Sequence, residues 1–239
     1  MISFKSAHSP KDVIIMAVRW YLAYPLSYRH VEDFLKERGF FIDHATVNRW
    51  VVKYAPLLEI TARKFKKQVN RSWKMDETYI KIKGKWHYYY RAVDTNGNTI
   101  DFFLSEKRDL EAAKAFLDKA ILAHGIPDKV NIDKSGSNLA ALKAINEAIN
   151  DEVVNNEVIN HKIKPKKKIF IRQIKYLNNL IEQDHRAVKR ITRPMMGFKN
   201  FNSASATLAG IELCHMIKKE QLLFDQTMPK WEQFYALAC

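Results

Sequence analysis

Cysteine, glycine and proline are all scarce in this chain, and each shortage excludes a class of protein. Of the 239 residues, two are Cys, seven are Gly and seven are Pro. Two cysteines, at positions 214 and 239, provide neither a disulfide framework nor a four-thiolate zinc site, which indicates a reducing compartment. So little Gly and Pro excludes a collagen-like or linker-dominated chain.

Long apolar runs are missing as well, which argues against a membrane protein. No stretch of about 18 uncharged apolar residues occurs, and the first residues lack the apolar segment of a signal peptide. The chain is nevertheless 47% hydrophobic, which is enough to build a folded core. We therefore expect a folded cytoplasmic protein with no membrane partner.

Basic residues outnumber acidic residues, which indicates a polyanionic partner. The chain has 40 Lys and Arg against 26 Asp and Glu, a formal net charge of +14. The excess lies in the flanks, because residues 1–72 carry +7 and residues 161–239 carry +9, whereas residues 73–160 carry −2. Basic flanks around a mildly acidic centre suit a nucleic-acid protein that holds cations on its central carboxylates.

Three helices are predicted in the first seventy residues. Apolar positions at three- and four-residue spacing begin at Lys11, and Pro25 ends this helix. Ser27 then caps a second helix, and Asp43 caps a third that ends at Pro56. Two short helices joined by a glycine-containing turn are typical of a helix-turn-helix, although an ordinary three-helix bundle gives the same pattern.

The third helix has a polar face suited to reading DNA. The side chains that its apolar stripe leaves toward solvent are His44, Thr46, Asn48, Arg49 and Lys53. Arg pairs with guanine and Asn with adenine, while Lys and Thr hold phosphates. A basic stretch at 63–71 follows and is the predicted domain boundary. We therefore predict a DNA-binding domain with a basic linker over residues 1–70.

From residue 72 the hydrophobic spacing changes from helical to alternating. Three β-rich segments, separated by turns at 83–84 and 94–98, predict an antiparallel meander. The elements that follow are a helix at 108–125, a strand at 129–133, a helix at 139–149, a strand at 167–174 and a helix at 178–190. This order predicts an α/β fold with a ribonuclease H-like mixed sheet over residues 71–239, and we expect a C-terminal helix at 203–219 to pack on it.

Carboxylates occur at the three places where such a fold carries a catalytic site. Asp76 lies in the first strand and Asp133 at the end of the fourth, where a buried aspartate is costly unless it binds a cation or finds donors. The later helix offers Glu182 and Asp184. Helical projection puts Glu182 on the polar face with His185, whereas Asp184 falls in the apolar stripe as a buried hydrogen-bonding residue or a metal ligand.

A resemblance to a known family rests on a series of strings along the chain. They are MDETYIK, YYYRAVD, GNTIDFFLS, IDKSGSN and RQIKYLNNLIEQDHRAVKR, with GFK and LAGIE beyond. Together they resemble the transposases of bacterial insertion-sequence family six, in which a helix-turn-helix precedes a ribonuclease H-like domain with an Asp-Asp-Glu triad. The resemblance covers roughly residues 10–220. The 49 positions from Asp133 to Glu182 exceed the usual spacing in the family, and the surplus falls at 149–164.

The resemblance implies a triad, a metal and a DNA substrate. Asp76 would bridge two Mg²⁺ ions, and Asp133 and Glu182 would hold one each, with Mn²⁺ as a substitute. The enzyme would bind its element's terminal inverted repeats and join strands into target DNA, as a homodimer or larger oligomer on the nucleoid. The residues that would hold DNA phosphates on the last helix are His185, Arg186 and Lys189. The alternatives are a DNA-binding regulator with an inactive ribonuclease H-like domain and a ribonuclease H-type nuclease.

Overall fold

The chain folds into two compact units that do not follow the predicted boundary throughout. A computed structural model describes residues 2–5, 9–134, 136–157, 168–225 and 227–239. The segments Met1–Lys67, Lys81–Lys85 and Arg186–Cys239 form a helical unit. Gln68–Ile80 and Trp86–His185 form a sheet unit. The C-terminal fifth of the chain therefore groups with the N-terminal helices, whereas the sequence predicted it to group with the sheet.

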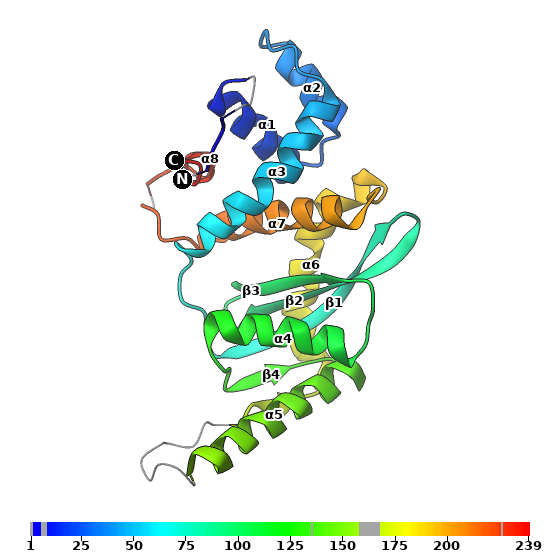
Figure 1. Cartoon of the computed structure of the whole chain (residues 1–239), viewed down its shortest axis with the longest axis vertical. Coiled ribbons are helices and arrows are strands. Elements are labelled where there is room, and N and C mark those ends of the chain that lie inside the picture. The colour runs from blue at the N-terminus through cyan, green and yellow to red at the C-terminus, as the bar shows by residue number, and fades with distance from the viewer. Residues whose placement is uncertain (1, 6–8, 135, 158–167, 226) are drawn as a thin grey trace. The chain divides into compact units, whose positions relative to one another are not determined.

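The helical unit is built around two long helices that pack on each other. Its principal helices are α1 (Lys11–Ala23), α2 (Tyr28–Lys36), α3 (His44–Arg63), α7 (Phe201–Lys218) and α8 (Lys230–Ala236) (Figure 1). Helix α7 packs against α3 and α1, and α8 covers α1 and α7. None of the helices in the described ranges combines the length and the apolarity needed to cross a bilayer.

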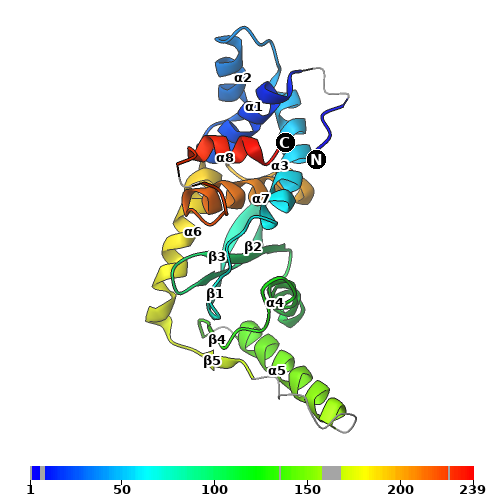
Figure 2. The same ribbon diagram turned by 90° about the vertical axis from the view of Figure 1, so that its left-hand side faces the viewer.

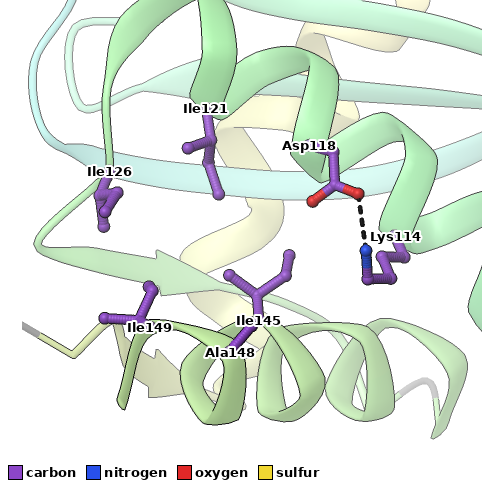
Figure 3. Close-up of a pocket in the computed structure, with 7 residues that line it drawn as sticks. All are labelled: Lys114, Asp118, Ile121, Ile126, Ile145, Ala148 and Ile149. Atoms are coloured by element: carbon purple, nitrogen blue, oxygen red, sulfur yellow. Dashed lines mark hydrogen bonds and ion pairs between the residues drawn. The ribbon is translucent and has the colours of Figure 1, made fainter. Parts of the chain in front are cut away.

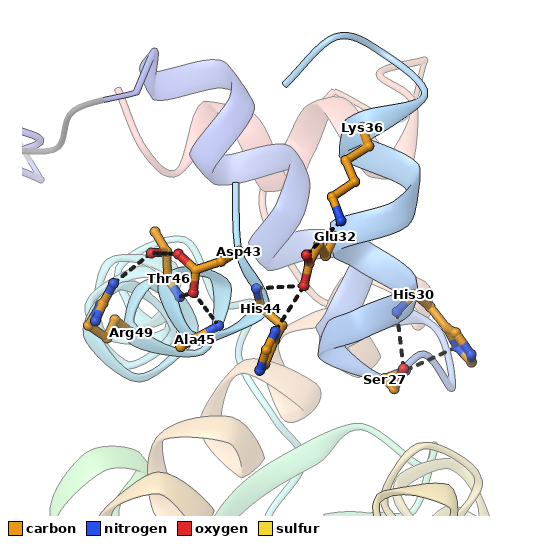
Figure 4. Close-up of polar contacts among 9 residues, drawn as sticks. All are labelled: Ser27, His30, Glu32, Lys36, Asp43, His44, Ala45, Thr46 and Arg49. Carbon is orange, nitrogen blue, oxygen red and sulfur yellow. Dashed lines mark hydrogen bonds and ion pairs between the residues drawn. The ribbon is translucent and has the colours of Figure 1, made fainter. Parts of the chain in front are cut away.

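The N-terminal caps of α2 and α3 are the ones that the sequence predicts. Ser27 Oγ accepts a hydrogen bond from the His30 backbone N–H, and His30 Nδ1 accepts one from the Ser27 N–H. The Asp43 carboxylate accepts from the backbone N–H groups of Ala45 and Thr46 (Figure 4). Both caps satisfy amide groups that have no partner inside the helix, which confirms the two predicted helix starts.

The predicted end of the third helix at Pro56 is wrong, because α3 continues to Arg63 with Pro56 in its interior. Leu58 and Ala62 remain buried beyond the proline, so the inner face of the helix extends by almost two turns. Proline removes one backbone hydrogen bond, and we attribute the continuation to packing of these later turns against α7.

Helix α7 is confirmed as a helix, but its expected position on the catalytic domain is wrong. Twelve of its 18 residues are buried, Thr207 and Glu212 among them, so the helix is covered around most of its circumference and lies inside the helical unit. A Cβ atom at Gly210 would lie 2.4 Å from Leu22 Cδ1 and 2.9 Å from Ala55 Cβ. Glycine therefore permits a close approach of α7 to α1 and α3 that a larger residue would block.

The sheet unit contains the predicted mixed sheet. Its strands are β1 (Ser72–Ile82), β2 (Lys85–Asp94), β3 (Thr99–Ser105), β4 (Lys129–Asn131) and β5 (Phe170–Arg172). Their order is β3-β2-β1-β4-β5. Strands β2 and β3 are antiparallel, while β4 runs parallel to both β1 and β5. A meander followed by two parallel strands reached through helices is the ribonuclease H-like arrangement, so the fold prediction is confirmed.

Helices cover both faces of this sheet. Helices α4 (Leu110–His124) and α5 (Gly136–Glu157) lie on one face, and the first part of α6 (Asn179–Thr192) lies on the other (Figure 2). The main core joins Trp73 and Met75 of β1 to Phe116 of α4 and Leu142 of α5. Helix α5 runs through the first part of the surplus segment 149–164, and the rest of that segment lies outside the described residues.

Candidate active site and nucleic-acid interface

Two of the three predicted carboxylates come at matched positions, one on β1 and the other just after the parallel strand β4. Lys74 of β1 pairs with Asn131 of β4, so Asp76 and Asp133 follow two residues later on each segment. The side chains of Asp76 and Asp133 keep 18% and 36% of their surface exposed. Both carboxylates are therefore open to a ligand from solvent. Their hard oxygen atoms are the donors that Mg²⁺ prefers.

Glu182, the third predicted carboxylate, is exposed near the start of α6. Within the described ranges, no group of three or more His, Cys, Asp and Glu side chains is arranged to hold a metal ion. The structure thus aligns Asp76 with Asp133 but does not gather Glu182 with them. The donor chemistry suits a divalent cation, and Glu182 would have to move to complete the site.

Asp184 takes the first of the two roles that the sequence left open, that of a buried hydrogen-bonding residue. Arg91 Nη2 lies 2.6 Å from Asp184 Oδ2, and the Arg91 side chain is completely buried in β2. Burying a guanidinium is costly unless a carboxylate and hydrogen bonds compensate for its lost hydration, and Asp184 provides the carboxylate. The sequence reasoning did not single out Arg91, although a charge inside the apolar strand YYYRAVD was a usable signal.

His185 does not face solvent, so that part of the helical projection is wrong. Only 5% of its side chain is exposed, and Nε2 lies 3.3 Å from Asp76 Oδ2. The buried residues Ile181, His185, Val188 and Thr192 follow three- and four-residue spacing, so the inner stripe of α6 includes this histidine. Burial also removes His185 from the set of residues available to DNA phosphates.

A second charged cluster lies next to the two aspartates and was also missed. Glu77 has a nearly fully buried side chain that forms an ion pair with Arg108 and accepts a 3.0 Å hydrogen bond from Asn138. Arg108 Nη2 also lies 3.7 Å from Asp133 Oδ2. Burial raises the pKa of the Glu77 carboxyl, while the Asn138 hydrogen bond and the Arg108 charge oppose that rise. Arg108 therefore links Glu77 to Asp133.

The first turn of α3 is fixed by a carboxylate of α2. Glu32 Oε2 accepts from the His44 backbone N–H at 3.0 Å and lies 2.9 Å from His44 Nδ1. Glu32 Oε1 accepts a 2.8 Å hydrogen bond from Lys36 Nζ (Figure 4). These hydrogen bonds from Lys36 and His44 lower the pKa of Glu32 to about 2. The exposed imidazole of His44 is thus held in one orientation.

A second chain of hydrogen bonds runs along the same turn. Thr46 Oγ1 donates to Asp43 Oδ2 and accepts from Arg49 Nη2, both at 2.6 Å. The side-chain hydrogen bond from Thr46 is the largest cause of a lowered Asp43 pKa. Arg49 remains exposed, so its guanidinium is oriented but still reachable.

The other predicted DNA-contacting residues differ in accessibility. Lys53 and Arg186 are exposed, whereas Asn48 and Lys189 are half-buried. The Asn48 side chain lies near the Tyr28 hydroxyl, where it opposes the rise in the Tyr28 pKa that burial causes, so it is less free to read a base than Arg49. The exposed members of the predicted set are therefore His44, Arg49, Lys53 and Arg186.

A pocket between α4 and α5 is separate from these charged groups. It has a volume of about 220 Å³, and isoleucines line most of it, with a 2.8 Å ion pair between Lys114 and Asp118 at its rim (Figure 3). None of the three predicted catalytic carboxylates lines it. It therefore adds nothing to the candidate site.

Known proteins match this chain over most of its length. The DDE domain family matches residues 70–221. A transposase for insertion sequence-like element IS431mec of Staphylococcus aureus is 42% identical over 218 residues, which are 91% of this chain and 89% of that protein. The transposase for insertion sequence element IS257 in transposon Tn4003 of the same species has the same identity and coverage. Among solved structures, the dimeric form of the HTLV-2 integrase catalytic core domain in complex with magnesium has a TM-score of 0.45 and 15% identity, covering 70% of this chain and 97% of that one.

Proposed function

The chain belongs to the DDE transposases of bacterial insertion-sequence family six, and we propose that Asp76, Asp133 and Glu182 are its catalytic triad. The protein is thus a DNA transposase, an enzyme that cleaves and joins DNA strands. The observation that carries the assignment is the matched position of Asp76 and Asp133 on β1 and after β4. The assignment of Glu182 rests on the resemblance. Glu182 lies on α6, the helix that also carries His185.

We propose Mg²⁺ as the metal, with Mn²⁺ as a substitute. Asp76 would contact two ions, while Asp133 and Glu182 would each hold one. Such ions, when bound, stabilise negative charge on the attacking and leaving oxygens of a phosphodiester. Arg108, which is one-third exposed beside Asp133, would hold a neighbouring DNA phosphate or remain on the carboxylate.

We propose that the helical unit binds the terminal inverted repeats. Arg49 would contact a guanine edge, and His44, Lys53 and Arg186 would hold phosphates. The net charge of +14 favours approach to DNA. Joining two element ends to one target requires at least two copies of such an end-binding surface, so we also propose a homodimer or larger assembly on DNA.

The experiment is strand joining by the full chain on an oligonucleotide duplex that carries the element end. We expect Asp76→Asn, Asp133→Asn and Glu182→Gln each to abolish joining while the variants remain folded and end binding stays close to wild type. Asp118→Asn and Glu147→Gln are matched controls, because both residues are exposed acids of the sheet unit outside the proposed triad.

Each triad member is tested separately. Retained joining in one variant contradicts the assignment of that residue, and loss of joining in the controls would point to a general effect of removing negative charge. No observation favours the alternative of a regulator with an inactive catalytic domain. Activity limited to RNA–DNA hybrids would support a ribonuclease H-type nuclease instead.

A further inference from the structure

A chain of polar groups runs beneath α6 to the first proposed catalytic carboxylate. Asp184 Oδ2 accepts a 2.6 Å hydrogen bond from Arg91 Nη2. Arg91 Nη1 lies 3.5 Å from His185 Nδ1, and His185 Nε2 lies 3.3 Å from Asp76 Oδ2. All four residues belong to the sheet unit. These contacts therefore connect β2, α6 and β1.

The guanidinium determines which imidazole nitrogen carries the proton. Arginine has only donors, so the nitrogen that faces it at hydrogen-bond distance, Nδ1 of His185, must accept. A neutral imidazole has one N–H, which then resides on Nε2. That nitrogen lies 3.3 Å from Asp76 Oδ2, at the distance of an ion pair rather than in the geometry of an aligned hydrogen bond. The opposite tautomer would place two donors against each other and leave Asp76 facing a lone pair.

We propose that Arg91 and His185 are positioning residues for the transposition reaction. Arg91 fixes the tautomer of His185, which keeps a proton on the nitrogen that lies 3.3 Å from Asp76 Oδ2. Asp184 keeps the guanidinium in place. This proposal rests on the proposed catalytic role of Asp76. A donor held beside a ligating carboxylate can orient it before its partners arrive, which lowers the cost of assembling the site.

The position of His185 on α6 gives the contact a second effect. Glu182 lies three residues earlier on the same helix, close to one turn away. Holding His185 against Asp76 therefore also fixes the register of α6 along β1, which restricts where Glu182 can go. Stability alone does not explain such a network, because apolar residues of similar size often replace a buried ion pair without loss of stability.

The tautomer of His185 can be measured without an activity assay. In the full chain at pH 8, nitrogen-15 NMR of the imidazoles should show His185 with its proton on Nε2, and His185→Gln identifies the signal by its disappearance. The double variant Arg91→Met/Asp184→Leu replaces the ion pair by apolar side chains. We expect it to shift the tautomer ratio toward Nδ1–H by about tenfold, as expected when a charge-assisted hydrogen bond is lost. A wild-type proton on Nδ1, or an unchanged ratio in the double variant, would overturn the role of Arg91.

Strand joining tests the role of His185. Glutamine can place an amide N–H near the position of Nε2, whereas leucine fills the space without a donor. We expect His185→Leu to lower joining by about 10- to 100-fold and to raise the Mn²⁺ concentration needed for half-maximal joining, with His185→Gln close to wild type. If His185→Leu and His185→Gln both fold and lose joining activity to the same extent, the positioning role of His185 is overturned. Joining by Asp76→Asn would instead overturn the proposed triad, and the NMR measurement would still decide what Arg91 does.

Discussion

The hydroxyl of Thr46 and the guanidinium of Arg49, one turn apart on α3, are joined by a 2.6 Å hydrogen bond. The same hydroxyl donates to Asp43, the residue that caps the helix. Arg49 is exposed, so this bond reduces its side-chain freedom without covering it. A side chain that is already oriented loses less entropy when it binds, which favours a specific contact over a diffuse one.

Arg49→Ala should therefore weaken sequence preference. We expect the full chain to lose about 1–3 kcal/mol of discrimination between a terminal-repeat duplex and a random duplex, and Thr46→Val to lose a smaller part. Lys53→Ala is the comparison. Loss of a phosphate contact should weaken binding to both duplexes equally and reduce the slope of affinity against salt concentration by about one. Dissociation constants at two salt concentrations measure both effects. Unchanged discrimination in Arg49→Ala would contradict a base-reading role.

Local signals in the sequence were sufficient to predict most of the elements. The caps at Ser27 and Asp43 and the alternation in the three β-rich segments depend on neighbouring residues alone, and both predictions are confirmed. Pro56 misled the prediction because the rule for helix ends ignores the packing partner. The position of α7 was missed for the same reason, since nothing local says which helices meet at Gly210.

The candidate site was predicted less completely than the fold. Asp76 and Asp133 were found because each stands out in an apolar strand. His185 was placed on the wrong face because it was counted as a polar residue that faces solvent. In the structure it contacts Asp76, a mostly buried carboxylate, and therefore lies on the inner face of α6. The sequence shows Arg91 as a charge inside an apolar strand, but the roles of Arg91 and Glu77 become clear only from their partners, because a buried charge is explained by residues distant in sequence.

Glu32 should give the helical unit a measurable acid response. Its folded-state pKa of about 2 lies below the ordinary value near 4.3, so its contribution to stability is complete above pH ~4.5 and is lost as the pH falls toward 2. We expect the thermal midpoints of wild type and Glu32→Gln to differ by a constant amount above pH 5 and to converge below pH ~4. The difference should be small, because the partners of Glu32 are largely exposed. A constant difference down to pH 2.5 would contradict the assigned pKa.

Gly210→Ala should destabilise the chain, since the added methyl group would overlap Leu22 and Ala55. Overpacking of this kind costs about 1–3 kcal/mol. Gly136→Ala is a matched control, because a Cβ there meets nothing within 4 Å, and alanine at the start of α5 should be neutral or slightly stabilising. Urea unfolding monitored by circular dichroism compares the two. Equal midpoints for the two variants would show that α7 can move away from α1 and α3 at little cost.

Binding of Mg²⁺ should stabilise the protein through the proposed triad. Before an ion binds, Arg108 lies beside Asp133 and His185 lies beside Asp76, and these contacts relieve part of the mutual repulsion between the two carboxylates. A ligand that binds only the folded state at 100 times its dissociation constant contributes about 2.7 kcal/mol, which raises the thermal midpoint by several degrees. Without metal, Asp76→Asn should be more stable than wild type. With Mg²⁺, it should lose most of the increase in thermal midpoint that the wild type shows. Ca²⁺ should also stabilise the wild type without supporting joining, because its looser coordination holds the reacting oxygens less strictly. An identical response to Mg²⁺ in wild type and Asp76→Asn would show that the ion binds elsewhere.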